Sequence, residues 1–168
     1  MRSDCDDRMA SLEVEGLVRQ GRLQAAIEIC EESLRKHPYC AGIHFDLGRL
    51  FYRTGAYSKA YKAFVYARDM DRLPLRAPTI FNQIVRELAD AAGDQVVLSD
   101  IERTFAGHSP GGIVGNELIT EYLHPTAYGH YLMAQTMFQG LAQSPIVEGW
   151  GASDTGRLKS YDDYSLQL

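Results

Sequence analysis

The chain has 168 residues, the length of one domain or two small ones, and its composition, 45% hydrophobic and 23% charged, is that of a globular protein. It holds 17 Lys and Arg against 22 Asp and Glu, and residues 75–168 hold only 5 of the basic side chains against 11 acidic ones. Because phosphate binding requires a clustered basic face, this balance argues against a nucleic-acid partner.

The sequence contains no apolar stretch of the roughly 18 residues that cross a bilayer, and charged side chains precede any apolar run at its N-terminus. We therefore expect no membrane span and a soluble, cytoplasmic protein, unless the chain is part of a longer, anchored one. Cys5, Cys30 and Cys40 form no Cys-x-x-Cys pair, which predicts neither a disulfide framework nor a thiolate zinc site. We expect no metal and no cofactor.

A repeat with a period of 34 residues runs through the first half of the chain. A shift of 34 aligns Gly21 with Gly55, Ala26 with Ala60, and Cys30 with Phe64. Each copy predicts an apolar helix, a turn at the glycine and a second apolar helix, with the alanines placed where the two helices approach closely. The sequence thus predicts two helical hairpins.

The second copy carries a family resemblance. Its large and small residues run in the order His44, Leu47, Gly48, Phe51, Gly55, Tyr57, Ala60, Phe64 and Ala67. This pattern resembles the tetratricopeptide repeat. In the first copy, Val14 and Leu17 stand where the second has Gly48 and Phe51, and Pro38 closes the copy as the family's proline does. The resemblance covers residues 9–73 and implies stacked helical hairpins that bind a protein or peptide in a groove.

Two hairpins leave an apolar face uncovered, because each repeat buries its face only against a neighbour. The segment 79–92 follows the breaks at Pro74 and Pro78 and carries Ile80, Ile84 and Leu88 at helical spacing. We expect this helix to cap the hairpins, which gives a first domain over residues 9–92.

The second half has a different pattern. Residues 95–99 (QVVLS) form a short apolar run that predicts a buried strand ending at Asp100. A loop rich in Gly and Pro follows over 106–116, and an amphipathic helix is predicted from Thr126 to Leu141. We expect an irregular tail over 143–168.

The segment from Arg76 to Leu141 resembles the C-terminal block of the SGNH or GDSL hydrolases. The resemblance rests on the strand that ends in Asp, on Glu121 three residues before His124-Pro125, and on the helix with Leu-Met-Ala that follows Gly-His. It implies, for a domain over residues 93–142, a remnant of a three-layer αβα sandwich and ester or acyl hydrolysis, with His124 as the general base. Glu121 stands where the family more often has Asp. Repeats joined to this block also resemble a bacterial subset of these hydrolases.

The implied chemistry is incomplete in this chain. A hydroxyl nucleophile needs a base in reach, and a carboxylate such as Glu121 can hold the imidazole of His124 in one tautomer. However, no Gly-Asp-Ser string occurs in the sequence, so the serine would have to come from another segment or a partner chain. We therefore expect the chain by itself to be inactive, whether or not it is part of an enzyme.

Two functions follow from these patterns. The first is the C-terminal part of a repeat-containing SGNH-like hydrolase or acyltransferase. The alternative is a protein–protein interaction module with a vestigial hydrolase segment. Both predict a mainly α fold with a small α/β part.

Other motifs have simpler interpretations. Ser109 lies in a Gly-x-Ser-x-Gly string, but Pro110 and the surrounding glycines favour a loop rather than the strand and helix that a nucleophile elbow requires. A polar cluster at the junction of the two halves is either solvated or bridges an interface, and it consists of Arg72, Arg76, Asn82 and Arg86. Alternatively, the resemblance to SGNH hydrolases implies that Arg76 and Asn82 lie near the mouth of a complete active site.

Overall fold

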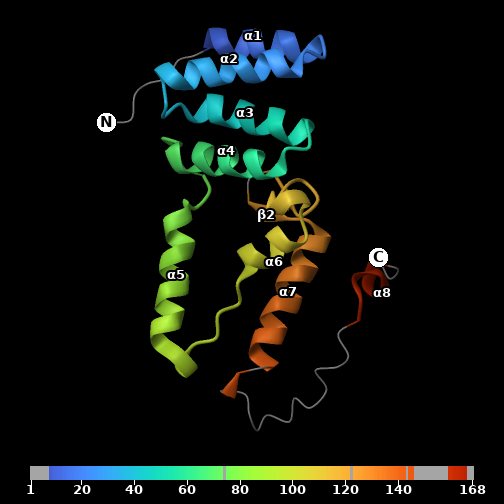
Figure 1. Cartoon of the computed structure of the whole chain (residues 1–168). Coiled ribbons are helices and arrows are strands. Elements are labelled where there is room, and N and C mark those ends of the chain that lie inside the picture. The colour runs from blue at the N-terminus through green and yellow to red at the C-terminus, as the bar shows by residue number, and fades with distance from the viewer. Residues whose placement is uncertain (1–7, 74, 122, 143, 146–158, 166–168) are drawn as a thin grey trace. The chain divides into compact units, whose positions relative to one another are not determined.

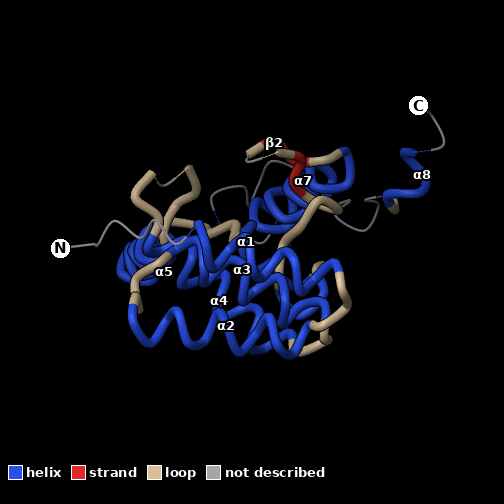
Figure 2. The backbone as a smooth tube through the Cα atoms, turned by 90° about the horizontal axis from the view of Figure 1, so that it is seen from above, coloured by secondary structure: helices blue, strands red, loops and turns tan. Residues whose placement is uncertain are grey.

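The computed structural model describes residues 8–73, 75–121, 123–142, 144–145 and 159–165 and is mainly helical, as the sequence predicts (Figures 1 and 2). The chain divides into two compact units, an N-terminal unit Met1–Thr79 and a C-terminal unit Ile80–Leu168. Each unit is described by itself. In the described residues, no helix is both long and apolar enough to cross a membrane.

The N-terminal unit is a stack of two helical hairpins. The first consists of α1 (Arg8–Arg19) and α2 (Leu23–Lys36), and the second of α3 (Ala41–Arg53) and α4 (Tyr57–Met70). Figure 1 shows the four helices layered in chain order, with α2 packed on α3. This arrangement confirms the predicted hairpins.

The two hairpin turns have the same geometry. Gly21 and Gly55 adopt φ values of 75° and 77°, in the left-handed region that favours glycine. In the first turn the N–H of Arg22 donates to the carbonyl of Leu17 at 2.9 Å, and in the second the N–H of Ala56 donates to Phe51 at 2.8 Å. These bonds close the end of the preceding helix and start the next. Hydrogen bonds 34 residues apart therefore confirm the repeat in the backbone.

The core of this unit lies between the hairpins. Its buried members come mainly from α1, α2 and α3 and are Ala10, Val14, Ala26, Ile27, Cys30, Cys40, Ile43, Leu47 and Leu50. Ala26 and Ala60, at equivalent positions, are both fully buried. Small residues at these two positions let the neighbouring helices approach closely, as the sequence predicts.

One pair of positions differs between the repeats in a compensating way. The second hairpin has Gly48 facing Phe64, and a Cβ built on Gly48 would lie 2.7 Å from Cδ1 of that ring. The equivalent positions of the first hairpin hold Val14 and Cys30, both buried. The first hairpin thus combines a medium-sized side chain, Val14, with a small one, Cys30. The second hairpin combines a glycine, Gly48, with a large side chain, Phe64. At these two positions the first repeat departs from the consensus because it divides the side-chain volume more evenly between its two helices.

This exchange gives a double-mutant prediction. Gly48→Val should overpack the second hairpin and lower the free energy of unfolding by about 1–3 kcal/mol. Phe64→Ala should also destabilise, because it leaves a cavity. The double variant should lose less than the sum of the two, with a coupling of about 0.5–3 kcal/mol in urea unfolding. Strictly additive losses would contradict the compensation.

The cysteines differ from the sequence prediction. Cys30 is buried, and Cys40 is disulfide-bonded, so one disulfide is present although the cysteine spacing predicts no disulfide framework. Spacing alone does not reveal which cysteines meet in the fold. Cys5 lies outside the described residues.

Helix α5 (Thr79–Ala92) has the bounds that the sequence predicts. Its first residue is held at the end of α4, where the N–H of Thr79 donates to Oδ1 of Asp69 at 3.0 Å and its hydroxyl to Oδ2 at 2.6 Å. Burial alone would raise the pKa of Asp69, but these hydrogen bonds and Arg68 outweigh it and hold the pKa below its usual value. The helix has no buried residue, and its apolar side chains Ile80, Phe81, Ile84, Val85 and Leu88 are exposed.

The capping role of α5 stays a prediction with a direct test. If α5 completes the stack, a chain ending at Arg72 should melt at a lower temperature and less sharply than one ending at Gly93, because uncovered terminal repeats lose cooperativity. Circular dichroism melts of the two truncated chains measure this. Equal midpoints and equal sharpness would show that the hairpins need no cap.

The C-terminal unit contains α6 (Ile101–Gly107), α7 (Ala127–Ala142) and a short α8 (Tyr161–Ser165), with 3₁₀ turns η1 (Gly93–Gln95) and η2 (Pro110–Gly112). Helix α6 packs on α7, and Phe105, Leu118 and Leu132 form the buried core. Gly129 is required there, because a Cβ on it would lie 2.4 Å from the carbonyl oxygen of Leu118. The predicted helix after Thr126 is confirmed.

The predicted strand over 95–99 is wrong. After η1 the segment is extended, with Val96 at φ −134° and ψ 135°, but it has no strand partner among the described residues, and Val96, Val97 and Leu98 are 36–48% exposed instead of buried. Within the described residues the sheet is a single antiparallel pair, β1 (Ile119–Thr120) with β2 (His124–Pro125). The expected αβα remnant is therefore not observed there, since a lone apolar run cannot form a sheet without neighbouring strands.

The tail is described only over residues 144–145 and 159–165. Helix α8 lies in the part predicted to be irregular, and it contacts α7 through aromatic rings. The Tyr161 ring lies 4.9 Å from that of Tyr128 and 5.6 Å from that of Tyr131, between centroids.

Candidate functional site

The N-terminal unit has a groove between α1 and α3, the first helices of the two hairpins. Its volume is about 240 Å³. The residues that line it are Val14, Glu15, Val18 and Arg19 from α1, and Asp46, Arg49, Leu50 and Arg53 from α3. Both repeats therefore contribute to one site.

The apolar lining of the groove joins the core. Val14 and Leu50 are almost fully buried, and Val18 is half-buried beside them. Next to them a hydrogen bond links the two helices, because the hydroxyl of Ser11 donates to Oδ2 of Asp46 at 3.2 Å. Burial raises the pKa of Asp46, although Ser11 and Arg49 partly offset this effect. The groove thus offers apolar surface beside the carboxyl group of Asp46, whose pKa is raised.

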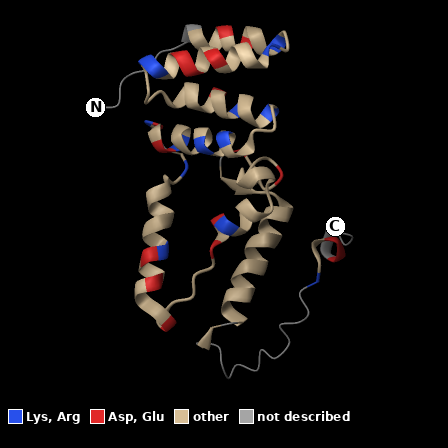
Figure 3. Ribbon diagram, viewed as in Figure 1, with Lys and Arg blue, Asp and Glu red and all other residues tan. Residues whose placement is uncertain are grey.

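Basic side chains lie toward one end of the groove. Arg19 and Arg53 occupy equivalent positions in the last turns of α1 and α3, where Figure 3 shows basic residues near the hairpin turns. Arg19 lies 3.6 Å from Glu15, and Arg49 lies 3.6 Å from Asp46. The Arg19–Glu15 pair is exposed on both sides and so holds its partners weakly, whereas Asp46 is largely covered. Arg53 forms no ion pair among the described residues.

The C-terminal unit holds the second candidate site, on the turn between β1 and β2. Nδ1 of His124 lies 3.1 Å from Oε2 of Glu121, with side chains that are 77% and 68% exposed. The backbone pairing of Thr120 with His124 closes the turn. Glu121 adopts φ 54°, the one non-glycine residue with positive φ in the described chain, and this strained conformation is found together with its contact to the imidazole.

This geometry fits one requirement of a general base. A carboxylate on Nδ1 fixes the tautomer of an imidazole and leaves Nε2 to accept a proton. In the described residues, the hydroxyl of Thr120 donates to the backbone carbonyl of His124 at 2.9 Å, but no hydroxyl group hydrogen-bonds the imidazole. Ser109 is buried and donates to Oε1 of Glu117 at 3.0 Å, and it follows helix α6 instead of a strand. The Gly-x-Ser-x-Gly string therefore does not form a nucleophile elbow.

Comparison with known proteins bears on the groove. A tetratricopeptide repeat is found at residues 17–67. The matched segment runs from the end of α1 into α4 and includes both glycine turns. No curated protein and no solved structure matches the chain. The repeat is the part of the sequence resemblance that these comparisons support, and they give no support to a hydrolase segment.

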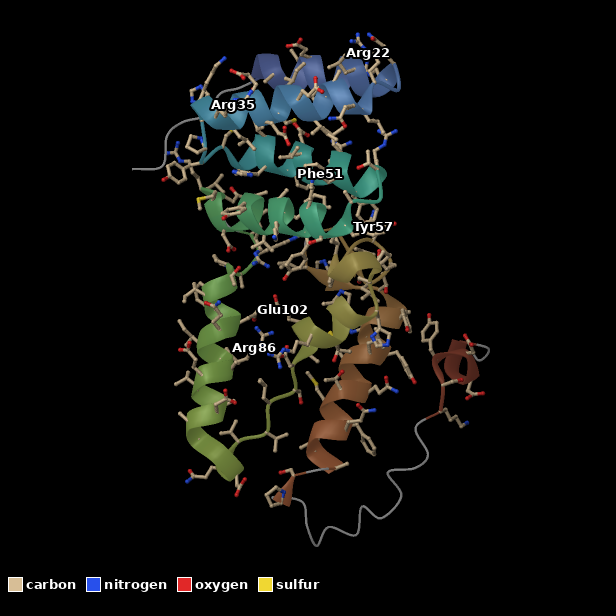
Figure 4. The ribbon with its side chains drawn as sticks, viewed as in Figure 1. Arg22, Arg35, Phe51, Tyr57, Arg86 and Glu102 are labelled. Carbon is tan, nitrogen blue, oxygen red and sulfur yellow. The ribbon has the colours of Figure 1, made fainter. Side chains whose placement is uncertain are left out.

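Arg86 has a structural role that the sequence does not specify. Its guanidinium donates to both oxygens of Asp100, at 2.8 and 3.0 Å, and to Oε2 of Glu102 at 2.7 Å (Figure 4). The hydrogen bonds from Arg86 lower the pKa of Asp100, which also caps α6 by accepting from the N–H of Arg103. Within this polar cluster, Arg86 ties α5 to the start of α6.

Sequence reasoning did not identify the residues of the groove. Arg19 and Arg53 are 34 residues apart, so the repeat period itself was a signal that could have paired them. Glu121 and His124, by contrast, were found because they are close in the sequence. No group of three or more His, Cys, Asp or Glu side chains positioned to hold a metal ion occurs in the described part of the chain.

Proposed function

We propose that the tetratricopeptide hairpins bind a segment of a partner protein in the groove between α1 and α3. The observation that carries this proposal is that equivalent helices of both repeats line one groove with an apolar floor and charged edges. A groove of this size holds one or two side chains of a peptide, and its apolar floor supplies the energy of burial. The surrounding charges supply orientation.

Two matched variants on α1 test the proposal. Val18→Asp places a charge on the wall of the groove, whereas Leu12→Asp places the same charge on an exposed position of the same helix that does not line it. Peptides selected from a random displayed library on the wild-type chain should bind Val18→Asp at least about tenfold more weakly, because the apolar contact is lost. Leu12→Asp should bind them unchanged.

Circular dichroism melts show that both variants are folded. If no selected peptide distinguishes Val18→Asp from Leu12→Asp, the groove is not the binding site and the proposal fails.

The pair His124 and Glu121 supports a second function. The contact of 3.1 Å between Nδ1 and Oε2 is the geometry that a general base for ester or acyl hydrolysis requires. We propose that His124 serves as this base, with Glu121 orienting it, once another segment or chain supplies a serine nucleophile. The proposal draws on the sequence resemblance to SGNH hydrolases.

The chain alone should hydrolyse p-nitrophenyl acetate no faster than His124→Ala. When a longer chain or a second chain supplies a Gly-Asp-Ser segment, activity should appear and fall by about 10²- to 10⁴-fold with His124→Ala, since general-base catalysis contributes about this much. Glu121→Gln should cost less, because an orienting carboxylate does not replace the base.

His130→Ala removes another exposed histidine, at the start of α7, and serves as the control. Activity that survives His124→Ala unchanged would end the hydrolase proposal and leave the interaction module.

A further inference from the structure

Helix α5 contacts its unit through its polar side. Arg86, near the middle of the helix, donates to Asp100 and to Glu102, and its side chain is 23% exposed (Figure 4). Asn82 and Ala89 lie four and three residues away, so they share this side of the helix, and both are half-buried. The side of α5 that faces the rest of the C-terminal unit is therefore the side that carries its arginine.

The apolar side chains of α5 lie on the opposite side and are exposed. At 3.6 residues per turn they form one stripe along the whole helix. This α5 stripe consists of Ile80, Phe81, Ile84, Val85, Leu88, Ala91 and Ala92. Its five large members are 44–64% exposed. Because a helix of a soluble protein ordinarily buries such a stripe and exposes its polar side, α5 is inverted relative to that pattern.

The exposed area is large enough for a specific contact. Five large side chains, each about half exposed, leave about 500 Å² of apolar surface on one helix, at the upper end of what a monomer ordinarily exposes. Two such stripes that face each other remove about 1,000 Å² from water, the lower limit of a specific interface. No charged side chain lies within the stripe, so this contact leaves no charge buried and unpaired.

The stripe changes in size along the helix, and this favours a second copy of the chain as its partner. The N-terminal end of the stripe carries Ile80 and Phe81, whereas the C-terminal end carries only Ala91 and Ala92. Two antiparallel copies place the large end of each over the small end of the other. Parallel copies would place large side chains together and leave a gap between the alanines.

Each flank of the stripe combines large and small side chains. At about 100° per residue, Phe81 and Ala92 lie on one flank, and Ile80, Ile84 and Ala91 lie on the other. A twofold axis between antiparallel copies brings each flank against the same flank of the second copy, in reverse order. Phe81 then meets Ala92, and Ala91 meets the two isoleucines.

The charges of α5 argue against a membrane surface as its partner. A helix that lies on a membrane carries Lys and Arg along its polar side. In α5 the polar side carries Glu87 and Asp90, and its one basic residue, Arg86, is bound to Asp100 and Glu102. Residues 75–168 also hold 5 basic side chains against 11 acidic ones.

We propose that α5 pairs with α5 of a second copy of this chain, antiparallel and about a twofold axis, so that Phe81 of each copy lies opposite Ala92 of the other. Twofold dimers are the commonest closed oligomers. This inference is independent of the two proposed functions. The capping role predicted for α5 uses the same stripe within one chain, and it is the alternative that the experiment separates.

Sedimentation of the full chain tests the pairing. The mass should rise from 18.8 kDa toward twice that value as the concentration rises from about 1 µM to about 1 mM, because an interface of this size is weak. Leu88→Asp should keep the chain monomeric over this range, since it places a charge within the stripe.

Two control variants should associate as the wild type does. Leu123→Asp removes a leucine outside α5 that has the same exposed fraction as Leu88, 64%. Gln83→Asp introduces the same residue as Leu88→Asp into α5, at an exposed position outside the stripe. Circular dichroism melts of the variants show that they are folded.

Disulfide trapping tests the direction of the pairing. When chains with Ile80→Cys are mixed with chains with Ala91→Cys and oxidised, the antiparallel pair should join position 80 of one chain to position 91 of the other. Positions 80 of two such chains lie at opposite ends of the pair and should not join. Disulfides that link 80 to 80 and 91 to 91 would contradict the antiparallel arrangement.

The other outcomes are equally defined. A mass of 18.8 kDa at every concentration would overturn the inference, and so would association that Leu88→Asp weakens no more than Leu123→Asp does. If the wild type stays monomeric and Leu88→Asp lowers its melting temperature, the stripe caps the hairpins of its own chain instead. If vesicles of anionic phospholipid capture the wild type but not Leu88→Asp, the stripe binds a membrane and the inference is wrong.

Discussion

The N-terminal unit depends on two glycines held in the left-handed region. Gly21 and Gly55 each end one helix and return the chain for the next, with hydrogen bonds repeated at the same spacing. Because both turns are alike, equivalent positions in the two hairpins meet equivalent surroundings. The groove follows from this equivalence, since α1 and α3 present the same turns of helix to one site. The two glycine turns place α1 and α3 side by side, and the groove between these helices results from that placement.

How well each feature could be predicted from the sequence depends on how local its cause is. The hairpins, α5 and α7 were predicted because helix formation depends on residues three or four apart. Glu121 and His124 were paired for the same reason, being on one short turn. The strand over 95–99 was wrong because an apolar run becomes a strand only beside another strand, and the described chain offers it none. The groove was missed because its two walls come from different repeats.

Polar contacts join elements that apolar packing alone leaves exposed. Helix α5 buries none of its side chains, yet Asp69 binds its first residue and Arg86 binds Asp100 from its middle. Bidentate contacts between a guanidinium and a carboxylate are directional, so they fix the angle of approach as well as the distance. Directional hydrogen bonds between Arg86 and Asp100 thus orient α5 within the C-terminal unit. The pairing of helices in the hairpins depends instead on how their side-chain volumes fit together.

The exchange of volume between the repeats also determines which helices can pair. A hairpin made of α1 and α4 would bring Val14 against the ring of Phe64, where even a single Cβ is too close. A hairpin made of α3 and α2 would bring Gly48 against Cys30 and leave a void. Similar repeats in one chain can mispair as it folds. The unequal division of volume fits α1 to α2 and α3 to α4 at these positions, so the departure of the first repeat from the consensus disfavours a hairpin assembled from the wrong halves.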